Sequence, residues 1–155
     1  MHFTIEPIGI IHSPFTEKEA CPIQGATSNQ AIGRVELSPQ YEAGLETIES
    51  FSHLILFYVF HQAGEVILCR PTFLDDQPHG VFASRHPCRP NSIGISIVEL
   101  RSRNNNILEV GDIDVLDGTP LIDIKPYVPR FDHRPTANNG WVADKEFTPK
   151  PAGRE

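Results

Sequence analysis

The sequence has few of the features that mark a membrane, secreted or disulfide-stabilised protein. Its longest apolar run, Leu54 to Phe60, is seven residues, whereas a membrane-spanning helix needs about 20. The first ten residues have neither the basic start nor the apolar core of a signal peptide. Only three cysteines occur, at positions 21, 69 and 88, and an odd, scattered set suits a reducing compartment. We therefore expect a cytoplasmic protein with no membrane partner.

Common metal and nucleotide motifs are also missing. The sequence has no CxxC, no HExxH and neither of the usual glycine-rich phosphate loops. Its seven histidines are scattered, and His86 with Cys88 is the one close His/Cys pair. Asp112, Asp114 and Asp123 form a possible carboxylate cluster, but alternating acids on a strand are more often solvated. We expect no metal.

Basic residues are scarce and unevenly placed. Thirteen lysines and arginines oppose twenty acidic residues, for a net charge of -7, which argues against a general nucleic-acid binder. Residues 70–134 nevertheless hold eight of those thirteen basic residues. Contact with an anionic partner would therefore depend on this local region.

Fourteen prolines and eleven glycines divide the chain into short pieces, which favours strands and turns over long helices. Apolar patterns predict strands at 4–12, 32–37, 53–61, 80–85, 92–100, 108–116 and 121–125. One short helix is expected at 39–49, with Ser38 as its N-cap. This pattern predicts an all-β barrel or sandwich over residues 1–135, followed by an irregular tail at 136–155.

Residues 84–94 are the most unusual stretch. The prolines that follow His86 and Arg89 hold those residues extended, so the loop presents stiff cationic side chains together with Asn91. Arginine on a rigid loop is suited to gripping a carboxylate or phosphate. Gly94 then leaves room on one strand face for the close approach of a ligand or backbone.

Two further features are candidates for ligand contact. Asp117-Gly118 is a strong turn signal between alternating strands, and such a turn would offer backbone groups as well as the Asp117 and Thr119 side chains. His61-Gln62 ends the most apolar strand, where a barrel mouth would place polar groups. The irregular segment 21–25 has similar potential.

Several of these motifs occur together in one known family. Phe51 to Leu54, Phe60 to Gln62, Gly80 to Ala83, Arg89 to Asn91 with Ile93-Gly94, and the segment 117–127 resemble the TsaA-like domain family in order and spacing. The resemblance covers residues 5–132. The family includes tRNA N6-adenosine methyltransferases that act at position 37.

The resemblance implies a small antiparallel β-barrel, a homodimer and the cofactor S-adenosylmethionine. It implies methylation at N6 of adenosine 37, the position that carries N6-threonylcarbamoyl-adenosine, in tRNA. Matched by position, the implied cofactor contacts are Pro22, Ile23, Gln24, His61, Gln62, Arg85, Ile95, Asp117, Gly118, Thr119 and Pro120. We further expect Asp117 or Asn91 to accept the N–H hydrogen of the methyl acceptor, and Arg89, Lys125 and Arg130 to bind RNA phosphates.

Two other functions fit the same sequence. The chain would then be a module that binds S-adenosylmethionine or a related nucleotide and signals to a protein partner, or a methyltransferase for a small molecule or protein. The short acidic chain favours these alternatives, whereas the arginine loop favours the tRNA enzyme.

Overall fold

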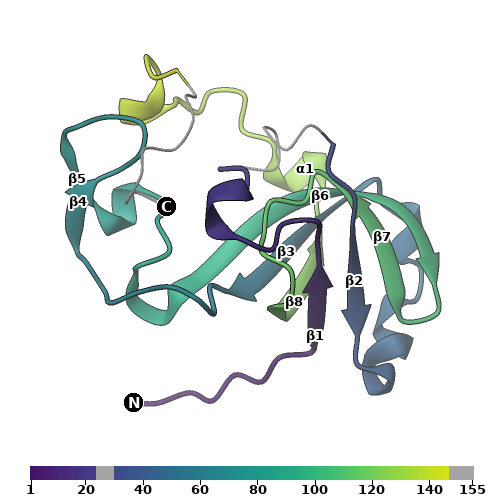
Figure 1. The fold of residues 1–155 in the computed structure, drawn as a ribbon. Helices are drawn as coiled ribbons and strands as arrows, with labels where there is room; N and C mark the ends of the chain where they lie inside the picture. Colours follow the sequence, from purple (N-terminus) through teal and green to yellow (C-terminus); the bar gives the residue numbers. More distant parts are fainter. Residues whose placement is uncertain (24–29, 147–155) are drawn as a thin grey trace.

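Six antiparallel strands close into a barrel in the computed structural model, which describes residues 1–23 and 30–146. The strands are β1 (Gly9–His12), β2 (Gly33–Leu37), β3 (His53–Val59), β6 (Ile93–Asn104), β7 (Ile107–Gly111) and β8 (Thr119–Pro126). Their order around the barrel is β1-β2-β7-β6-β3-β8, and β8 pairs with β1 to close it (Figure 1). This confirms the predicted all-β antiparallel barrel.

Strand alternation decides which side chains fill the barrel. In β3, Leu54, Leu56 and Tyr58 point inward and are buried, while the residues between them face outward. The register places Leu56 opposite Ser96 and Tyr58 opposite Gly94 of β6. The interior is apolar along most of its length, with a core of Ile11, Val35, Leu37, Leu54, Leu56, Val98, Leu108, Val110, Ile113 and Leu121. Towards one mouth it becomes polar, at Tyr58, Ser96 and Thr119.

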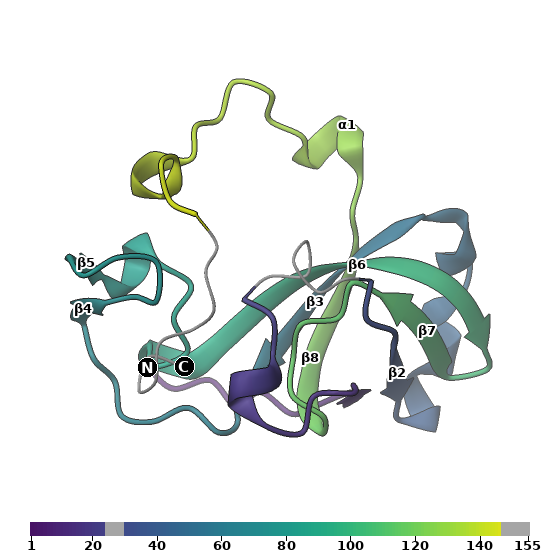
Figure 2. The ribbon, with the colours of Figure 1, turned by 45° about the horizontal axis from the view of Figure 1, so that its top comes forward.

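A small lobe lies beside that mouth. It contains the two-stranded sheet of β4 (Cys69–Pro71) and β5 (Pro78–Gly80). After the four-residue helix α1 (Pro129–Asp132), the chain arches away from the barrel to the 3₁₀ turn Gly140–Val142, which lies near the lobe (Figures 1 and 2). The lobe and this arch therefore flank one end of the barrel.

Four sequence predictions differ from the structure. The strand expected at 108–116 is shorter, because β7 ends at Gly111. The helix expected at 39–49 consists of two 3₁₀ segments, Pro39–Leu45 and Ile48–Ser50, separated by Thr47 in the left-handed region at φ 65°, and the Ser38 side chain does not cap it. The strand expected at 80–85 is wrong, because a 3₁₀ turn follows β5 at Val81–Ala83 and buries only Val81. The opening strand begins at Gly9 rather than at residue 4.

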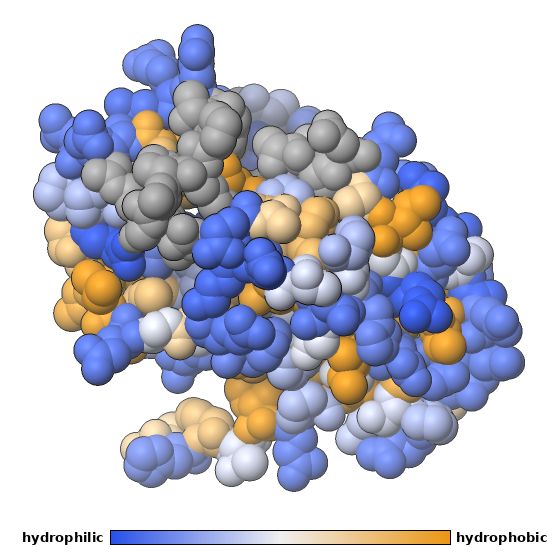
Figure 3. All heavy atoms as spheres, in the orientation of Figure 1, coloured by the Kyte–Doolittle hydropathy of each residue, from blue (hydrophilic) through white to orange (hydrophobic). Residues whose placement is uncertain are grey.

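Among the described residues, no helix is long and apolar enough to cross a bilayer. On the face shown in Figure 3, apolar residues form small separate patches among hydrophilic ones. The first residues extend from the barrel as an exposed arm.

Candidate functional site

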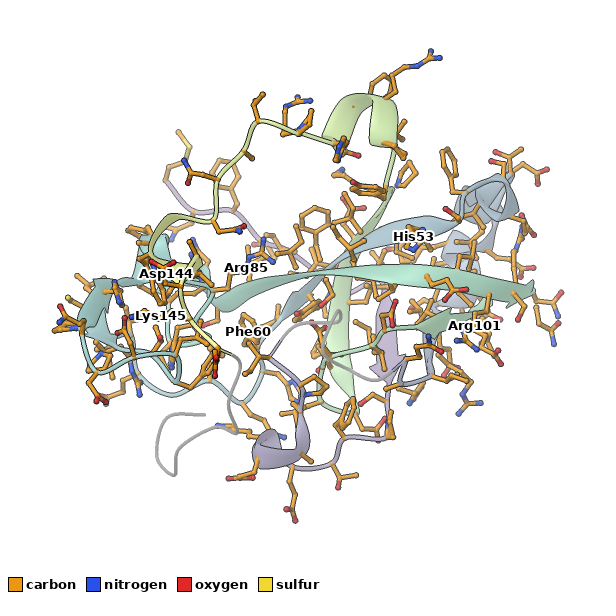
Figure 4. All side chains as sticks on the ribbon, turned by 90° about the horizontal axis from the view of Figure 1, so that it is seen from above. His53, Phe60, Arg85, Arg101, Asp144 and Lys145 are labelled. Atoms are coloured by element: carbon orange, nitrogen blue, oxygen red, sulfur yellow. The ribbon has the colours of Figure 1, made fainter. Side chains whose placement is uncertain are left out.

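A cavity of about 760 Å³ opens at the polar mouth of the barrel. Its walls come from the ends of β3 and β6, the segment after β3, the small lobe, the arginine loop and the C-terminal 3₁₀ turn. This volume lies in the range of about 300–1,000 Å³ that is typical of small-molecule sites. Figure 4 shows Arg85 and Phe60, two of its lining residues, close to the same end of β6.

Seven of the predicted cofactor residues line this cavity: Pro22, Ile23, His61, Gln62, Arg85, Ile95 and Thr119. They come from five separate parts of the chain, and the closed barrel brings them together. Gln24 lies outside the described residues. Asp117, Gly118 and Pro120 flank the cavity wall without being among its described lining residues, so their contact with a cofactor stays a prediction.

The Asp117-Gly118 turn is bonded to the segment around β1. Its two amides donate to the carbonyls of Phe15 and Ile11 at 2.8 and 2.9 Å, and the Asp117 carboxylate accepts from the Ser13 amide at 3.0 Å. Gly118 has φ 81°, which glycine adopts readily. The expectation that this turn offers its amides to a ligand is therefore wrong for these two N–H groups.

The arginine loop is held by its own hydrogen bonds. The Arg89 guanidinium donates to the Ser84 carbonyl at 2.9 Å, and Asn91 adopts the left-handed region at φ 63°, as its place after Pro90 allows. Arg85 is exposed and Arg89 is partly buried, and both line the cavity. Asn91 is exposed and is not among the described lining residues. Its predicted catalytic role stays a prediction.

His86 is buried in this loop. Its Nδ1 accepts the Cys88 amide at 3.1 Å, so the neutral ring carries its hydrogen on Nε2, which has no partner among the described residues. Burial, followed by the nearby charges of Arg70 and Arg89, lowers the pKa of His86 to about 4. The ring is therefore neutral at physiological pH.

A chain of polar groups lies at the inner end of the cavity. The Tyr58 hydroxyl contacts Ser96 Oγ at 2.9 Å, and Ser96 Oγ donates to Asp114 Oδ1. Gly94 leaves room for the Tyr58 and Phe60 rings, because a Cβ there would lie 2.3 Å from Tyr58 Cε2 and 2.8 Å from Phe60 Cζ. Thus the close approach at Gly94 is made by two aromatic rings rather than by a ligand or backbone.

The segment after α1 is anchored to the lobe. Trp141 stacks on His79 with ring centroids 3.8 Å apart and donates from Nε1 to the Ala83 carbonyl at 2.8 Å. Lys145 pairs with Asp75 at 3.1 Å, and so does His79. Partial burial raises the pKa of Asp75, but the bonds from Lys145 and His79 outweigh it and hold that pKa below its ordinary value. Residues assigned to a tail thus form part of the cavity wall.

The remaining predicted RNA residues lie away from the cavity lining. Lys125 is exposed on β8 and pairs with Asp123 at 2.8 Å, and Arg130 is exposed on α1. Within residues 1–23 and 30–146, no three His, Cys, Asp or Glu side chains are grouped as metal ligands.

Sequence reasoning missed Tyr58, Ser96 and Trp141 as parts of the site, and considered Asp114 only as a metal ligand. Tyr58 and Ser96 belong to alternating strands and look like core positions. Trp141 lies in a segment without periodicity. The available signal for Trp141 was that the chain's one tryptophan lies in a segment that contains proline and asparagine.

Comparison with known proteins agrees with this geometry. Residues 10–133 match the family model described as the tRNA-methyltransferase O N-terminal domain. A relative from Pyrococcus abyssi, named a probable S-adenosyl-L-methionine-binding protein, is 52% identical over 136 residues, which cover 88% of this chain and 74% of that protein.

Longer bacterial proteins match as well. The tRNA (adenine(37)-N6)-methyltransferase of Escherichia coli is 40% identical over 150 residues, covering 90% of this chain and 64% of the enzyme. A crystal structure of TrmO superposes with a TM-score of 0.80 at 43% identity, covering 90% of this chain and 64% of that one. The chain therefore spans somewhat less than two thirds of each of these two proteins.

Proposed function

Because the chain belongs to the family of tRNA-methyltransferase O N-terminal domains, we propose that it is an S-adenosylmethionine-dependent methyltransferase acting on N6 of adenosine 37 in tRNA. One observation carries this proposal. Within residues 10–133, which match the family model and include all of the barrel strands except Gly9, seven residues predicted to contact the cofactor converge on one cavity.

The cavity suits S-adenosylmethionine in size and chemistry. Ile95, Phe60 and neighbouring apolar side chains offer surfaces for adenine, and the Arg85 fork suits a carboxylate. Bound there, S-adenosylmethionine supplies a methyl group on a positively charged sulfur, which requires no metal. Binding should consequently be unaffected by a chelator.

The protein's own residues position the methyl acceptor. Holding the N6 nitrogen in line with the methyl group supplies much of the acceleration in such a transfer. N6 must also lose a proton, and Asp117 or Asn91, both exposed beside the cavity wall, are our candidates to accept its hydrogen bond. The acceptor includes adenosine that already carries the threonylcarbamoyl group.

Transfer RNA would bind through a local cationic surface. Lys125 and Arg130 are exposed, and each phosphate contact would make binding dependent on salt. Arg89 donates a hydrogen bond to the Ser84 carbonyl within its own loop. Its replacement should therefore change the shape of the cavity as well as weaken RNA binding. We place the protein in the cytoplasm, where its tRNA substrate is processed.

A homodimer is supported by an apolar outer face next to the cavity. The outward residues of β3 and β6 pair across the two strands, Ile55 with Ile97, Phe57 with Ile95 and Val59 with Ile93. The three β6 isoleucines are 38–47% exposed. Since Ile93 and Ile95 also line the cavity, a second copy on this face would lie directly beside the site.

A non-enzymatic sensor is the second candidate function. The Pyrococcus abyssi relative is named only for binding S-adenosylmethionine, and the net charge of -7 is unfavourable for RNA. Methylation of a small molecule or protein is the remaining alternative.

Mass spectrometry of tRNA nucleosides separates these functions. Cells that lack the protein should lose an N6-methylated adenosine derivative, and the gene for the unchanged chain should restore it. An Arg85→Ala variant that folds should restore it poorly. Identical nucleoside profiles with and without the protein would favour the sensor.

A further inference from the structure

Asp114 is the one carboxylate among the described residues that line the cavity. It is partly buried, and its Oδ1 accepts a hydrogen bond from Ser96 Oγ. Ser96 and Tyr58 behind it are 4% exposed each. The Asp114 carboxylate therefore lies at the inner end of the cavity, where it is bonded to buried Ser96.

The direction of that hydrogen-bond chain can be assigned. The carboxylate only accepts, so the Ser96 hydrogen points to Asp114. Tyr58 then donates its single hydrogen to Ser96 Oγ at 2.9 Å rather than to the Ile95 carbonyl at 3.4 Å. Burial, then the charge of Asp114, raises the pKa of the Tyr58 hydroxyl, which therefore stays protonated. The chain Tyr58 to Ser96 to Asp114 thus fixes the orientation of the Asp114 carboxylate.

Positive charge lines the same cavity. Arg85 lines the cavity with Asp114, and its charge opposes that of Asp114 at Tyr58. The described lining therefore combines one carboxylate, Asp114, with the guanidinium groups of Arg85 and Arg89, and that of Arg89 is bonded to the Ser84 carbonyl. An α-amino acid has the matching pattern, with an ammonium and a carboxylate on one carbon.

We propose that Asp114, oriented by Ser96 and Tyr58, binds the α-ammonium group of the methionine part of S-adenosylmethionine while Arg85 binds its α-carboxylate. This assignment rests on the proposed cofactor. A carboxylate accepts several hydrogen bonds at once, so the Ser96 bond and an ammonium contact are compatible. The cavity would thereby select adenosine derivatives that carry an intact amino acid.

Three ligands and three variants test the assignment by calorimetry. S-adenosylmethionine has the amino acid and the sulfonium, S-adenosylhomocysteine has the amino acid without the charge on sulfur, and 5′-methylthioadenosine has neither. Asp114→Asn keeps the shape of the side chain and removes its charge. Asp112→Asn, on a nearby acid outside the described cavity lining, is the matched control.

We expect Asp114→Asn to weaken both amino-acid ligands by the same factor, roughly 10- to 100-fold, as for a hydrogen bond between charged groups. The affinity of the Asp114→Asn variant for 5′-methylthioadenosine should stay within about twofold of that of the unchanged chain, since this ligand has no ammonium group to make the contact. Ser96→Ala should give a smaller loss with the same ligand pattern. Asp112→Asn should match the unchanged chain throughout.

Other patterns overturn the assignment. A loss for S-adenosylmethionine alone would place Asp114 opposite the sulfonium, and an equal loss for all three ligands would mean that the residue only maintains the fold. Unchanged affinities for every ligand would leave Asp114 without a part in binding. If the unchanged chain bound none of the three, the proposed cofactor itself would fail, and the assignment with it.

Discussion

At the scale of single residues, His86 gives the fold a dependence on pH. Its pKa is about 4 in the folded chain and about 6.5 when exposed. Between these values the unfolded chain binds a proton that the folded chain does not, so stability falls as the pH drops from about 6.5 towards 4. Above about pH 6.5 the ring is neutral in both the folded and the unfolded chain, so the loss of stability caused by His86 is absent there.

The variant His86→Asn tests that dependence, because its Oδ1 can still accept the Cys88 amide. Denaturant midpoints measured from pH 7.5 to pH 4.5 should fall less steeply for the variant than for the unchanged chain. Parallel curves for the two proteins would show that His86 does not contribute.

Gly94 is a second residue on which the shape of the site depends, because it leaves room for the Tyr58 and Phe60 rings. In Gly94→Ala the new methyl group would have to displace Tyr58 and Phe60, which should cost about 1–3 kcal/mol of unfolding free energy and weaken cofactor binding. Gly80→Ala has nothing within 4 Å of the added Cβ and should be nearly neutral. Chemical denaturation of both variants checks this, and equal stabilities would refute the role given to Gly94.

At the scale of elements, the fluorescence of Trp141 reports on the segment that follows α1 and is anchored to the lobe. It is the one tryptophan of the chain, it lines the cavity and it stacks on His79. We expect S-adenosylmethionine to change its fluorescence with the same dissociation constant that calorimetry gives. The signal should be larger in His79→Ala, where the ring loses its stacking partner. Binding without any fluorescence change would place the cofactor away from this segment.

The elements also show how far sequence patterns reach. A continuous apolar run predicted β3, and alternating isoleucines predicted β6, whose other face is buried in the barrel. An apolar pattern failed at 80–85, where only Val81 is buried and a 3₁₀ turn follows β5. The helix at 39–49 followed from apolar spacing, yet Thr47 at φ 65° divides it. The Asp114 chain was out of reach, since it joins three residues that only the closed barrel brings together.

At the scale of the whole molecule, the outer face of β3 and β6 should form the dimer contact. Light scattering is expected to give about twice the monomer mass of 17.3 kDa. Ile97→Glu would place a charge in that contact and should shift the protein to monomers. Ile10→Glu is the matched control, because Ile10 is 45% exposed and Ile97 is 47% exposed, and it should stay dimeric. A dimer that survives Ile97→Glu would contradict this choice of face.

Methyl transfer by the purified protein tests the central claim most directly. The chain is incubated with S-adenosylmethionine labelled in its methyl group and with tRNA from cells that lack the protein, and the tRNA is digested for mass spectrometry. We predict label on N6 of adenosine 37, in tRNA with the threonylcarbamoyl group, and much less label with Arg85→Ala. A protein that binds S-adenosylmethionine yet transfers no label to any tRNA nucleoside would contradict the account.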